Sequence, residues 1–412
     1  MTHVVFVAPF LLDATLRFVD VTAELDGVCV CLVTQDPEDR VPTALRAKLA
    51  AQHRVDDALD PRQISTAVRS LSQRFGEVDR LMGSLEQLQV PLARVREELG
   101  IPGMGVEAAT NFRDKARMKD VLQLAGMPCA RHRLAETPED AWDFVGRVGY
   151  PVVTKPPAGA GAEGMFRVDG PEQLEKVLAV VPPRPGDPLM VEEFVRGEEH
   201  SFDSVFINGG LVWCSISDYL PSPLEVLETP WMQWCVLLPR DIEGPRYEGI
   251  REAAVGSLEA LGMDTGFSHM EWFRKADGSL AISEVAARPP GAQFTTLISY
   301  AHDVDMYRAW ARLMAFGTFE VPERTYAAGA AYLRGLGRGR VKAIHGLEQA
   351  HEELGDLVVE AKLPVPGQPA SGSYEGEGYV ILRHPDTDVV HRGLERLVSL
   401  LRVELVEDRS TP

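Results

Sequence analysis

The chain has 412 residues, of which 45% are hydrophobic and 25% are charged, and its formal net charge is −19. This composition is typical of a globular protein with several cores, and the acidic excess without a long Lys/Arg run argues against binding to nucleic acid. No stretch is apolar enough to cross a membrane, and the first residues lack the features of a signal peptide, so we expect a cytoplasmic protein.

The N-terminal part, residues 1–108, alternates short apolar runs with helical patterns. The runs cover residues 3–7, 28–33 and 79–83. Continuous apolar strands separated by helices predict a small parallel sheet that is covered on both faces. The turn after the first run lacks a GxGxxG pattern, so no dinucleotide site is expected there.

Two lysines follow, each at a defined place in a predicted element. Residues 111–126, NFRDKARMKDVLQLAG, predict a helix with Lys115 in its first turns. Residues 150–155, YPVVTK, predict a buried strand that ends in Lys155, and a loop with glycines at 159, 161 and 164 comes next. Such a loop lets backbone amides approach phosphate oxygens, while the strand lysine supplies a fixed charge. The alternatives are a solvated helix face for Lys115 and a surface hairpin for the loop.

A strand with two acids and an antiparallel hairpin form the next part of the pattern. Residues 189–195, LMVEEFV, predict a strand, and residues 201–207 and 211–216 predict a hairpin that turns at Asn208-Gly209-Gly210. A strand edge can hold an adenine through its backbone groups, and an acid a few residues later can accept hydrogen bonds from a ribose.

The segment of residues 267–293 predicts a second hairpin that carries two carboxylates. Glu271 and Glu284 lie at even offsets from Phe273 and Ile282, so we expect both to point to one face. Adjacent carboxylates are stabilised by a cation between them, and oxygen ligands suit Mg²⁺, with Mn²⁺ as the alternative. Arg288 follows four residues after Glu284. The alternative is a solvent-facing hairpin with hydrated charges.

Helical patterns over 245–262 and 299–316 flank this hairpin, and a smaller unit begins near residue 328. We expect its strands over 328–333, 357–362 and 378–383, and its helices over 346–354 and 387–401. A glycine-rich segment over 335–339 is interpreted as a loop that can lie over the site.

The order of these features resembles that of the ATP-grasp superfamily, and the resemblance covers nearly the whole chain. It is carried by DKARMKDVLQLAGMP, YPVVTKPPAGAGAEG, LMVEEFVRGEEHSFD, HMEWF and SEVAARPPG. The resemblance implies an α/β (α+β) protein with a Rossmann-like pre-ATP-grasp domain over 1–108. An ATP-grasp domain would follow, with subdomains over 109–185 and 186–325, and then a C-terminal α+β subdomain over 326–412.

The resemblance also implies ATP and Mg²⁺ as cofactors and a role for each site residue. The phosphates would be held by Lys115, Lys155 and the loop glycines Gly159, Gly161 and Gly164. The adenine would lie on the hinge of Glu192, Glu193, Phe194 and Val195, with Glu192 helping to bind the amino group, and the ribose on Glu199. Mg²⁺ would be bound by Glu271 and Glu284, and Arg288 would act with Lys155 in catalysis by orienting the substrate.

One position departs from the family's pattern. The family usually has ExNxR at the second metal position, whereas this chain has Glu284-Val285-Ala286-Ala287-Arg288. Alanine cannot coordinate, so either a water takes that place or only one Mg²⁺ is held tightly. The same loss occurs in some members of the L-amino acid ligase branch, which favours that branch.

The implied function is an ATP-dependent ligase that joins a carboxylic acid to an amine through an acyl phosphate. Two alternatives stay open: a carboxylase that activates bicarbonate with the same residues, and a nucleotide-binding module that has lost catalysis. The sequence does not identify the acid, the amine, the pathway or the oligomeric state, although homodimers are common in the family.

Overall fold

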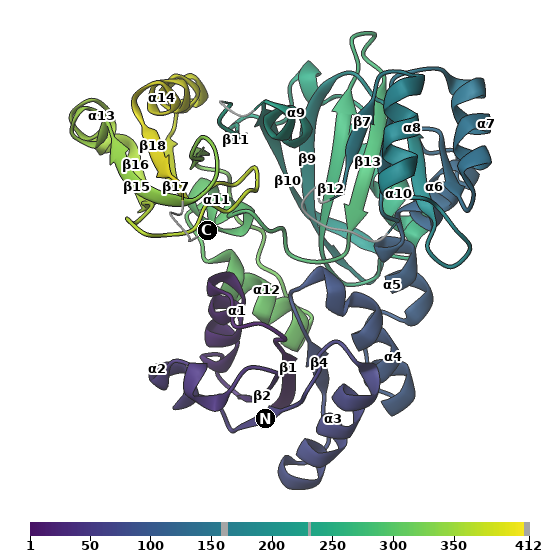
Figure 1. Cartoon of the computed structure of the whole chain (residues 1–412). Coiled ribbons are helices and arrows are strands. Elements are labelled where there is room, and N and C mark those ends of the chain that lie inside the picture. Colours follow the sequence, from purple (N-terminus) through teal and green to yellow (C-terminus); the bar gives the residue numbers. More distant parts are fainter. Residues whose placement is uncertain (158–163, 230–231, 408–412) are drawn as a thin grey trace, which may run out of the picture.

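The N-terminal segment forms a three-layer unit around a parallel sheet of order β3-β2-β1-β4 (Figure 1). The computed structural model of the chain describes residues 1–157, 164–229 and 232–407. Alternate side chains of β1 face opposite cores: Val4 and Phe6 pack towards α1, and Val5 and Val7 pack towards α3. Besides 3-10 turns at Glu38–Arg40 and Glu86–Leu88, the elements are β1 (Thr2–Val7), α1 (Asp13–Ala23), β2 (Val28–Thr34), α2 (Thr43–Arg46), β3 (Ala51–Arg54), α3 (Pro61–Phe75), β4 (Arg80–Met82) and α4 (Gln89–Leu99).

The helix predicted over 111–126 is two helices, α5 (Val106–Arg113) and α6 (Lys115–Leu124). The chain breaks at Asp114, whose φ of −93° and ψ of 108° are extended. Its carboxylate accepts hydrogen bonds from the backbone N–H groups of Ala116 and Arg117, which caps α6. The single-helix prediction is therefore corrected, and Lys115 becomes the first residue of α6.

An antiparallel sheet of order β5-β8-β6-β7 follows, with two helices packed on it. The sheet extends past the subdomain boundary expected at 185/186, because β8, which lies after that boundary, pairs with both β5 and β6. The elements are β5 (His132–Ala135), α7 (Pro138–Val148), β6 (Val152–Lys155), β7 (Phe166–Val168), α8 (Pro171–Val180) and β8 (Leu189–Glu193).

An antiparallel sheet of order β13-β12-β9-β10-β11-β14-β17-β16 is the largest in the described part of the chain. The expected boundary at 325/326 runs through it, because β14 continues the sheet from β11. The two predicted hairpins form as β9 with β10 and β12 with β13. The strands are β9 (Glu198–Ile207), β10 (Gly210–Leu220), β11 (Cys235–Leu238), β12 (Gly266–Arg274), β13 (Leu280–Ala286), β14 (Ala327–Leu333), β16 (Val358–Lys362) and β17 (Gly378–His384).

Helices cover both faces of this sheet. On one face, α10 packs with α5 and α6 over Phe202 and Trp272. On the other, α11 and α12 pack towards the N-terminal unit, where α12 lies against α1 (Figure 1). The helix predicted over 299–316 is thus two helices, separated at Asp303, which has a φ of +54°. The helices are α9 (Pro223–Glu228), α10 (Ile250–Leu261), with a 3-10 turn at Pro245–Tyr247 before it, α11 (Phe294–His302) and α12 (Met306–Phe316).

The C-terminal part adds helices and a two-stranded sheet to the edge of the large sheet. Strands β15 (Arg340–His345) and β18 (Arg402–Val406) pair with each other, and the sequence patterns predicted neither. The helices predicted there form as α13 (Leu347–Leu354), which is followed by a 3-10 turn at Gly355–Leu357, and α14 (Thr387–Leu400).

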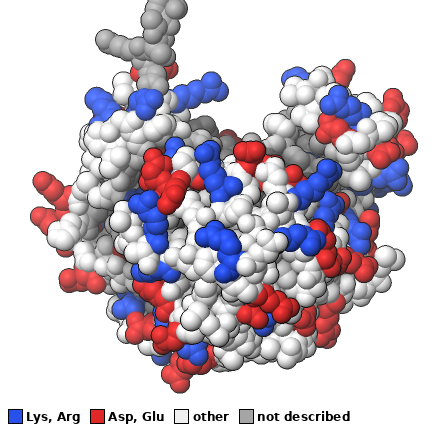
Figure 2. All heavy atoms as spheres, turned by 90° about the horizontal axis from the view of Figure 1, so that it is seen from below, with Lys and Arg blue, Asp and Glu red and all other residues white. Residues whose placement is uncertain are grey.

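The surface and the helices agree with the charge pattern of the sequence. Within the described residues, no helix is both long and apolar enough to span a bilayer. Figure 2 shows acidic and basic side chains interspersed over the face seen from below, rather than a continuous basic field on that face.

Candidate active site

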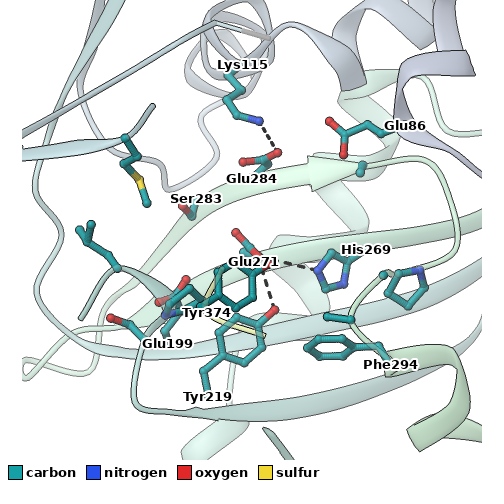
Figure 3. Close-up of a pocket in the computed structure, with 18 of the residues that line it drawn as sticks. Glu86, Lys115, Glu199, Tyr219, His269, Glu271, Ser283, Glu284, Phe294 and Tyr374 are labelled. Atoms are coloured by element: carbon teal, nitrogen blue, oxygen red, sulfur yellow. Dashed lines mark hydrogen bonds and ion pairs between the residues drawn. The ribbon is translucent and has the colours of Figure 1, made fainter. Parts of the chain in front are cut away.

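A cavity of about 900 Å³ lies where the N-terminal unit, the β5-β8-β6-β7 sheet and the large sheet meet. Figure 3 shows how several of its side chains converge over the β12–β13 hairpin. Gly159 and Gly161 lie outside the described residues, and Gly164, with a φ of +70°, is not part of the cavity wall. The predicted site residues that line the cavity are Lys115, Lys155, Glu192, Glu193, Val195, Glu199, Glu271, Glu284 and Arg288.

The two predicted metal ligands face each other across the hairpin. Glu271 pairs with Glu284, whereas Trp272 pairs with Ile282, so Ser283 is an extra residue that forms a β-bulge. The bulge changes the alternation: Ile282 is fully buried in the core beneath the sheet, while Glu284 lines the cavity. The expectation that both glutamates share a face is confirmed, but the expectation that Ile282 marks that face is wrong, because simple alternation ignores the bulge.

The chemistry of this pair fits Mg²⁺, which proteins commonly hold through one or two carboxylates while phosphates and waters complete the octahedron. Lys115 forms an ion pair with Glu284. Although burial favours the neutral acid, Lys115 and Lys155 hold the pKa of Glu284 below its usual value. Ala286 lies opposite His269 and supplies no ligand atom. Among the described residues, no group of three or more His, Cys, Asp or Glu side chains is arranged to hold a metal by itself.

A buried ion-pair cluster lies beside the hairpin. The Nζ atom of Lys155 is 2.8 Å from one carboxylate oxygen of Glu192, and the Nζ atom of Lys119 is 3.2 Å from the other. Burial opposes ionisation of Glu192, but Lys119 and Lys155 outweigh it and lower its pKa to about 2. Although burial also opposes the charge on Lys155, Glu192 and Glu284 hold the pKa of Lys155 above its usual value. The side chain of Glu192, expected at an adenine amino group, is thus engaged by lysines.

Lys119 is a site residue that the sequence analysis missed. Its side chain is 1% exposed, and its Nζ atom donates to the Ser283 carbonyl at 3.0 Å, so it also ties α6 to the bulge. The signal that could have found it is spacing, because Lys115 and Lys119 lie four residues apart and therefore share one helix face.

The expected hinge residues line the same cavity. The carboxylate of Glu193 forms an ion pair with Arg131, so it is not a free carboxylate for binding a nucleotide. Burial and the nearby charge of Glu271 raise the pKa of Glu199 well above its usual value. A hydrogen-bond donor or cation beside Glu199 would relieve this, which suits the expected contact with ribose hydroxyls.

His269 is held between two carboxylates on the face of the sheet that lines the cavity. Its Nδ1 atom is 2.7 Å from Asp203, and its Nε2 atom is 3.9 Å from Glu271. Burial opposes the charge on this ring, but Asp203 outweighs burial and raises the pKa of His269 to about 9. The Tyr219 hydroxyl also points at Glu271, at 3.5 Å (Figure 3). His269 is therefore a charged neighbour that orients Glu271.

Arg288, expected to be available to the substrate, has a carboxylate partner from the N-terminal unit. Its Nη2 and Nε atoms are 2.8 and 3.2 Å from Oε2 of Glu86. The other oxygen of Glu86 is 3.2 Å from Arg113. The sequence analysis missed Glu86 because it lies 202 positions from Arg288 and in no recognisable motif.

Comparisons with known proteins agree with this arrangement. Residues 114–200 match the family model for the ATP binding domain of the carbamoyl-phosphate synthase L chain. The chain is 25% identical over 263 residues to the L-arginine-specific L-amino acid ligase of Bacillus subtilis, covering 62% of each protein. It is 25% identical over 276 residues to the alanine–anticapsin ligase of Bacillus subtilis strain 168, covering 62% of this chain and 57% of that one. The match therefore spans less than two thirds of each relative.

Two solved structures share the whole fold. The L-amino acid ligase from Bacillus licheniformis superposes with a TM-score of 0.78 at 19% identity, covering 99% of both chains. The N5-carboxyaminoimidazole ribonucleotide synthetase from Thermotoga maritima superposes with a TM-score of 0.73 at 19% identity, covering 98% of this chain and 100% of that one.

The fold and the matched ATP binding region place the chain in a class of mixed α/β proteins with this arrangement of sheets. In residues 114–200 and in its overall fold, the chain is similar to ATP-grasp ligases, as the resemblance of its motifs implied. Fold membership does not by itself specify the reaction, so the activity has to be argued from the residues of the cavity.

Proposed function

We propose that the protein is an ATP-dependent ligase that joins a carboxylic acid to an amine. In the first step, a carboxylate oxygen of the acid attacks the γ-phosphorus of ATP, the bond to the β-phosphate oxygen breaks, and ADP leaves. In the second step, the amine nitrogen attacks the acyl carbon, inorganic phosphate leaves, and the nitrogen loses a proton. An amide or peptide bond results.

The observation that carries this proposal is the convergence of lysines, paired carboxylates and an arginine on one cavity. The first step brings two anions together, so neutralising charge is its main demand. Lys155 and Lys119 place positive charge at the expected phosphate side, and Arg288 places a guanidinium near the carboxylate pair. Mg²⁺ bound at Glu271 and Glu284 would supply the remaining charge neutralisation. Support for the ligase reaction over other ATP-dependent reactions comes from the names of the two Bacillus subtilis relatives.

The chain's own residues also define how the acid would be oriented. Arg288 is 17% exposed and already binds one carboxylate, that of Glu86, through two nitrogens. Its Nη1 atom also donates to the Pro289 carbonyl at 2.9 Å. Because a guanidinium has five N–H donors in a planar fork that matches the geometry of a carboxylate, the remaining N–H groups can bind a second carboxylate. The acid would then lie between Arg288 and the hairpin glutamates, within reach of the γ-phosphate.

The test is a screen of carboxylic acids paired with amines for release of ADP, with hydroxylamine added to trap the acyl phosphate as a hydroxamate. We expect ADP release to depend on an acid, and hydroxamate to form only when ATP and Mg²⁺ are both present. ADP release stimulated by bicarbonate without any amine would instead identify a carboxylase. ATP binding without turnover by any acid would identify a binding module that has lost catalysis.

A further inference from the structure

One wall of the cavity is built from aromatic rings. We define the aromatic wall as Tyr219, Trp234, Phe294 and Tyr374, all of which line the cavity. The ring centroids of Tyr219 and Trp234 are 5.5 Å apart, and those of Trp234 and Tyr374 are 4.8 Å apart at 87°. Tyr219 also lies 5.7 Å from Phe294. The rings therefore pack against one another in edge-to-face and tilted contacts and form a continuous surface.

The loop between β16 and β17, which carries Tyr374, is anchored at its base. The Glu377 carboxylate accepts hydrogen bonds from the backbone N–H groups of Gly335 and Ser371, at 2.7 and 2.8 Å. Gly376 has a φ of +63°, and a methyl group there would overlap the Leu333 backbone. These contacts hold residues 374 and 375 at the cavity, which places a feature from the C-terminal part at the site.

Glu375 is the next residue on this loop, and its carboxylate lacks a partner. Several acids of the cavity are engaged by cations: Glu192 by two lysines, Glu284 by Lys115 and Glu86 by arginines. Glu199, expected at the ribose, forms no ion pair within the described part of the chain and lies near Glu271. Within the described residues, Glu375 forms no hydrogen bond and no ion pair, although it lines the same cavity. Burial alone raises its pKa. A partly buried carboxylate without a partner is costly unless something binds to it.

The aromatic wall connects the reaction centre to Glu375. Tyr374 lies close to Glu271 and Tyr219 (Figure 3), and its hydroxyl interacts electrostatically with Glu375, Glu271 and Arg288. A substrate whose carboxylate lies at Arg288 can therefore run along the ring of Tyr374 and reach Glu375. Aromatic faces attract cations, and a carboxylate at the end of such a surface completes a site for one.

We propose that Tyr374 and Glu375 determine specificity by binding a positively charged nitrogen group, an ammonium or a guanidinium, on one of the substrates. This inference rests on the proposed ligase function and adds the chemical class of its substrate. A neutral substrate would leave the Glu375 carboxylate unpaired in the occupied cavity, and a site with an unpaired buried polar group rejects such a substrate strongly.

The experiment compares acids of similar chain length with hydroxylamine as the constant nucleophile. L-Lysine carries both an α-ammonium and a side-chain ammonium, and Nα-acetyl-L-lysine carries only the side-chain ammonium. L-Norleucine carries only the α-ammonium, and hexanoate carries neither. We expect the protein to prefer a cationic acid over hexanoate in kcat/KM by about tenfold or more, and Glu375→Gln to remove most of that preference. If Nα-acetyl-L-lysine keeps the preference over hexanoate, the recognised cation is on the side chain; if L-norleucine keeps it, the recognised cation is the α-ammonium.

A second arm tests whether the cation belongs to the amine. The best acid of the screen is paired with 1,5-diaminopentane or with pentylamine, and the ratio of kcat/KM values is compared between the natural protein and Glu375→Gln. The matched control is Glu352→Gln, which removes the same charge from an exposed position of the C-terminal part. The control should leave both ratios unchanged.

The outcomes separate this inference from the proposed function. If Glu375→Gln leaves the ratio of cationic to neutral substrates within about twofold in both arms, the inference is overturned while the ligase function stands. If no acid produces ADP or hydroxamate, the proposed function itself fails. Thermal unfolding of Glu375→Gln adds an independent readout, because removal of an unpaired buried charge should leave the melting temperature unchanged or raise it. A lowered melting temperature would indicate a structural role and would also overturn the inference.

Discussion

Glu284 combines several interactions on the hairpin, since it faces Glu271, pairs with Lys115 and lies near Lys155 and Arg288. We expect Glu284→Gln to lower the rate of ADP formation about a hundredfold to a thousandfold, because the neutral amide removes charge from the expected Mg²⁺ site. Affinity for ATP, measured by calorimetry without Mg²⁺, should change little, because the hinge lies on other elements. Glu259→Gln on the exposed face of α10 is the control. Unchanged turnover in Glu284→Gln would exclude the hairpin as the metal site.

His302, at the end of α11, gives a pH dependence that is separate from the site. The residue is 4% exposed, and burial, with Arg324 nearby, lowers its pKa to about 4. An unfolded histidine titrates near pH 6.5, so below that pH the unfolded chain binds a proton that the folded chain does not. The free energy of unfolding should therefore fall as pH drops from about 6.5 towards 4, by at most about 3 kcal/mol from this residue.

Urea unfolding at pH 7 and pH 4.5 measures this effect. The His302→Gln variant should show a smaller loss between the two pH values than the natural protein, because glutamine does not titrate. His351→Gln, at an exposed position of α13, should show the full loss. An identical loss in His302→Gln would contradict the assignment.

For single residues of the cavity, the sequence predicted the acids and lysines that belong to motifs and missed those that do not. Lys115, Lys155, Glu271 and Glu284 were found because each lies at a recognisable place in an element. Glu86 and Glu375 reach the cavity only through tertiary packing, from a 3-10 turn and from a loop of the C-terminal part. No local pattern reports such a position. Lys119 could have been predicted from helical spacing, because it lies four residues after Lys115.

Among the elements, the β12–β13 hairpin was predicted with both strands and its turn, but its bulge was not. A bulge adds one residue and shifts the phase of the alternation partway along the strand, so alternation extended from one end assigns the wrong face at the other. The helix break at Asp114 was missed for a related reason: residues on both sides keep a helical pattern, and only the cap marks the boundary. Strands β3, β15 and β18 were missed because they are short and carry charged or polar residues.

The connection between β8 and β9 depends on Gly197, which packs against the end of β12. A methyl group at 197 would come within 2.9 Å of the Arg274 carbonyl carbon and closer still to its oxygen. Gly197→Ala should therefore push the expected hinge away from β12, lowering the free energy of unfolding by about 1–3 kcal/mol and weakening ATP binding. Gly146→Ala on α7 is the control, since nothing lies within 4 Å of the added group. It should be neutral or stabilise by up to about 1 kcal/mol. Equal behaviour of the two variants would show that the backbone contact at 197 does not constrain the hinge.

For the whole molecule, one core joins parts that the sequence predicted as separate domains. Phe6 and Phe18 of the N-terminal unit, Trp310 of α12 and Val236 of the large sheet belong to the same buried cluster. Apolar periodicity shows that a face is buried but not which element covers it. The fold class was therefore predictable, whereas the continuous large sheet and this shared core were not. Cytoplasmic location and homodimer formation stay predictions.

Variants of Glu86 test whether its contact with Arg288, which connects the N-terminal unit to the hairpin, matters for function. Glu86 is 6% exposed on its side chain and binds Arg113 and Arg288, which are 19% and 17% exposed. Glu86→Ala removes the carboxylate from two largely buried guanidinium groups, so we expect a loss of about 3 kcal/mol in the free energy of unfolding. Because Arg288 also loses the partner that orients it, the KM for the acid should rise more than kcat falls.

Two further variants separate orientation from stability. Glu86→Gln keeps the shape of the side chain and one acceptor oxygen, and should restore part of the stability while the KM for the acid stays raised, since the charged partner of Arg288 is still absent. Glu98→Ala breaks the exposed pair with Arg69 in the same N-terminal unit, where the two side chains are 50% and 59% exposed. Its effect on unfolding should be much smaller, because water screens that pair. If Glu86→Gln and Glu86→Ala both leave the KM for the acid unchanged, Glu86 holds the N-terminal unit to the hairpin without orienting Arg288.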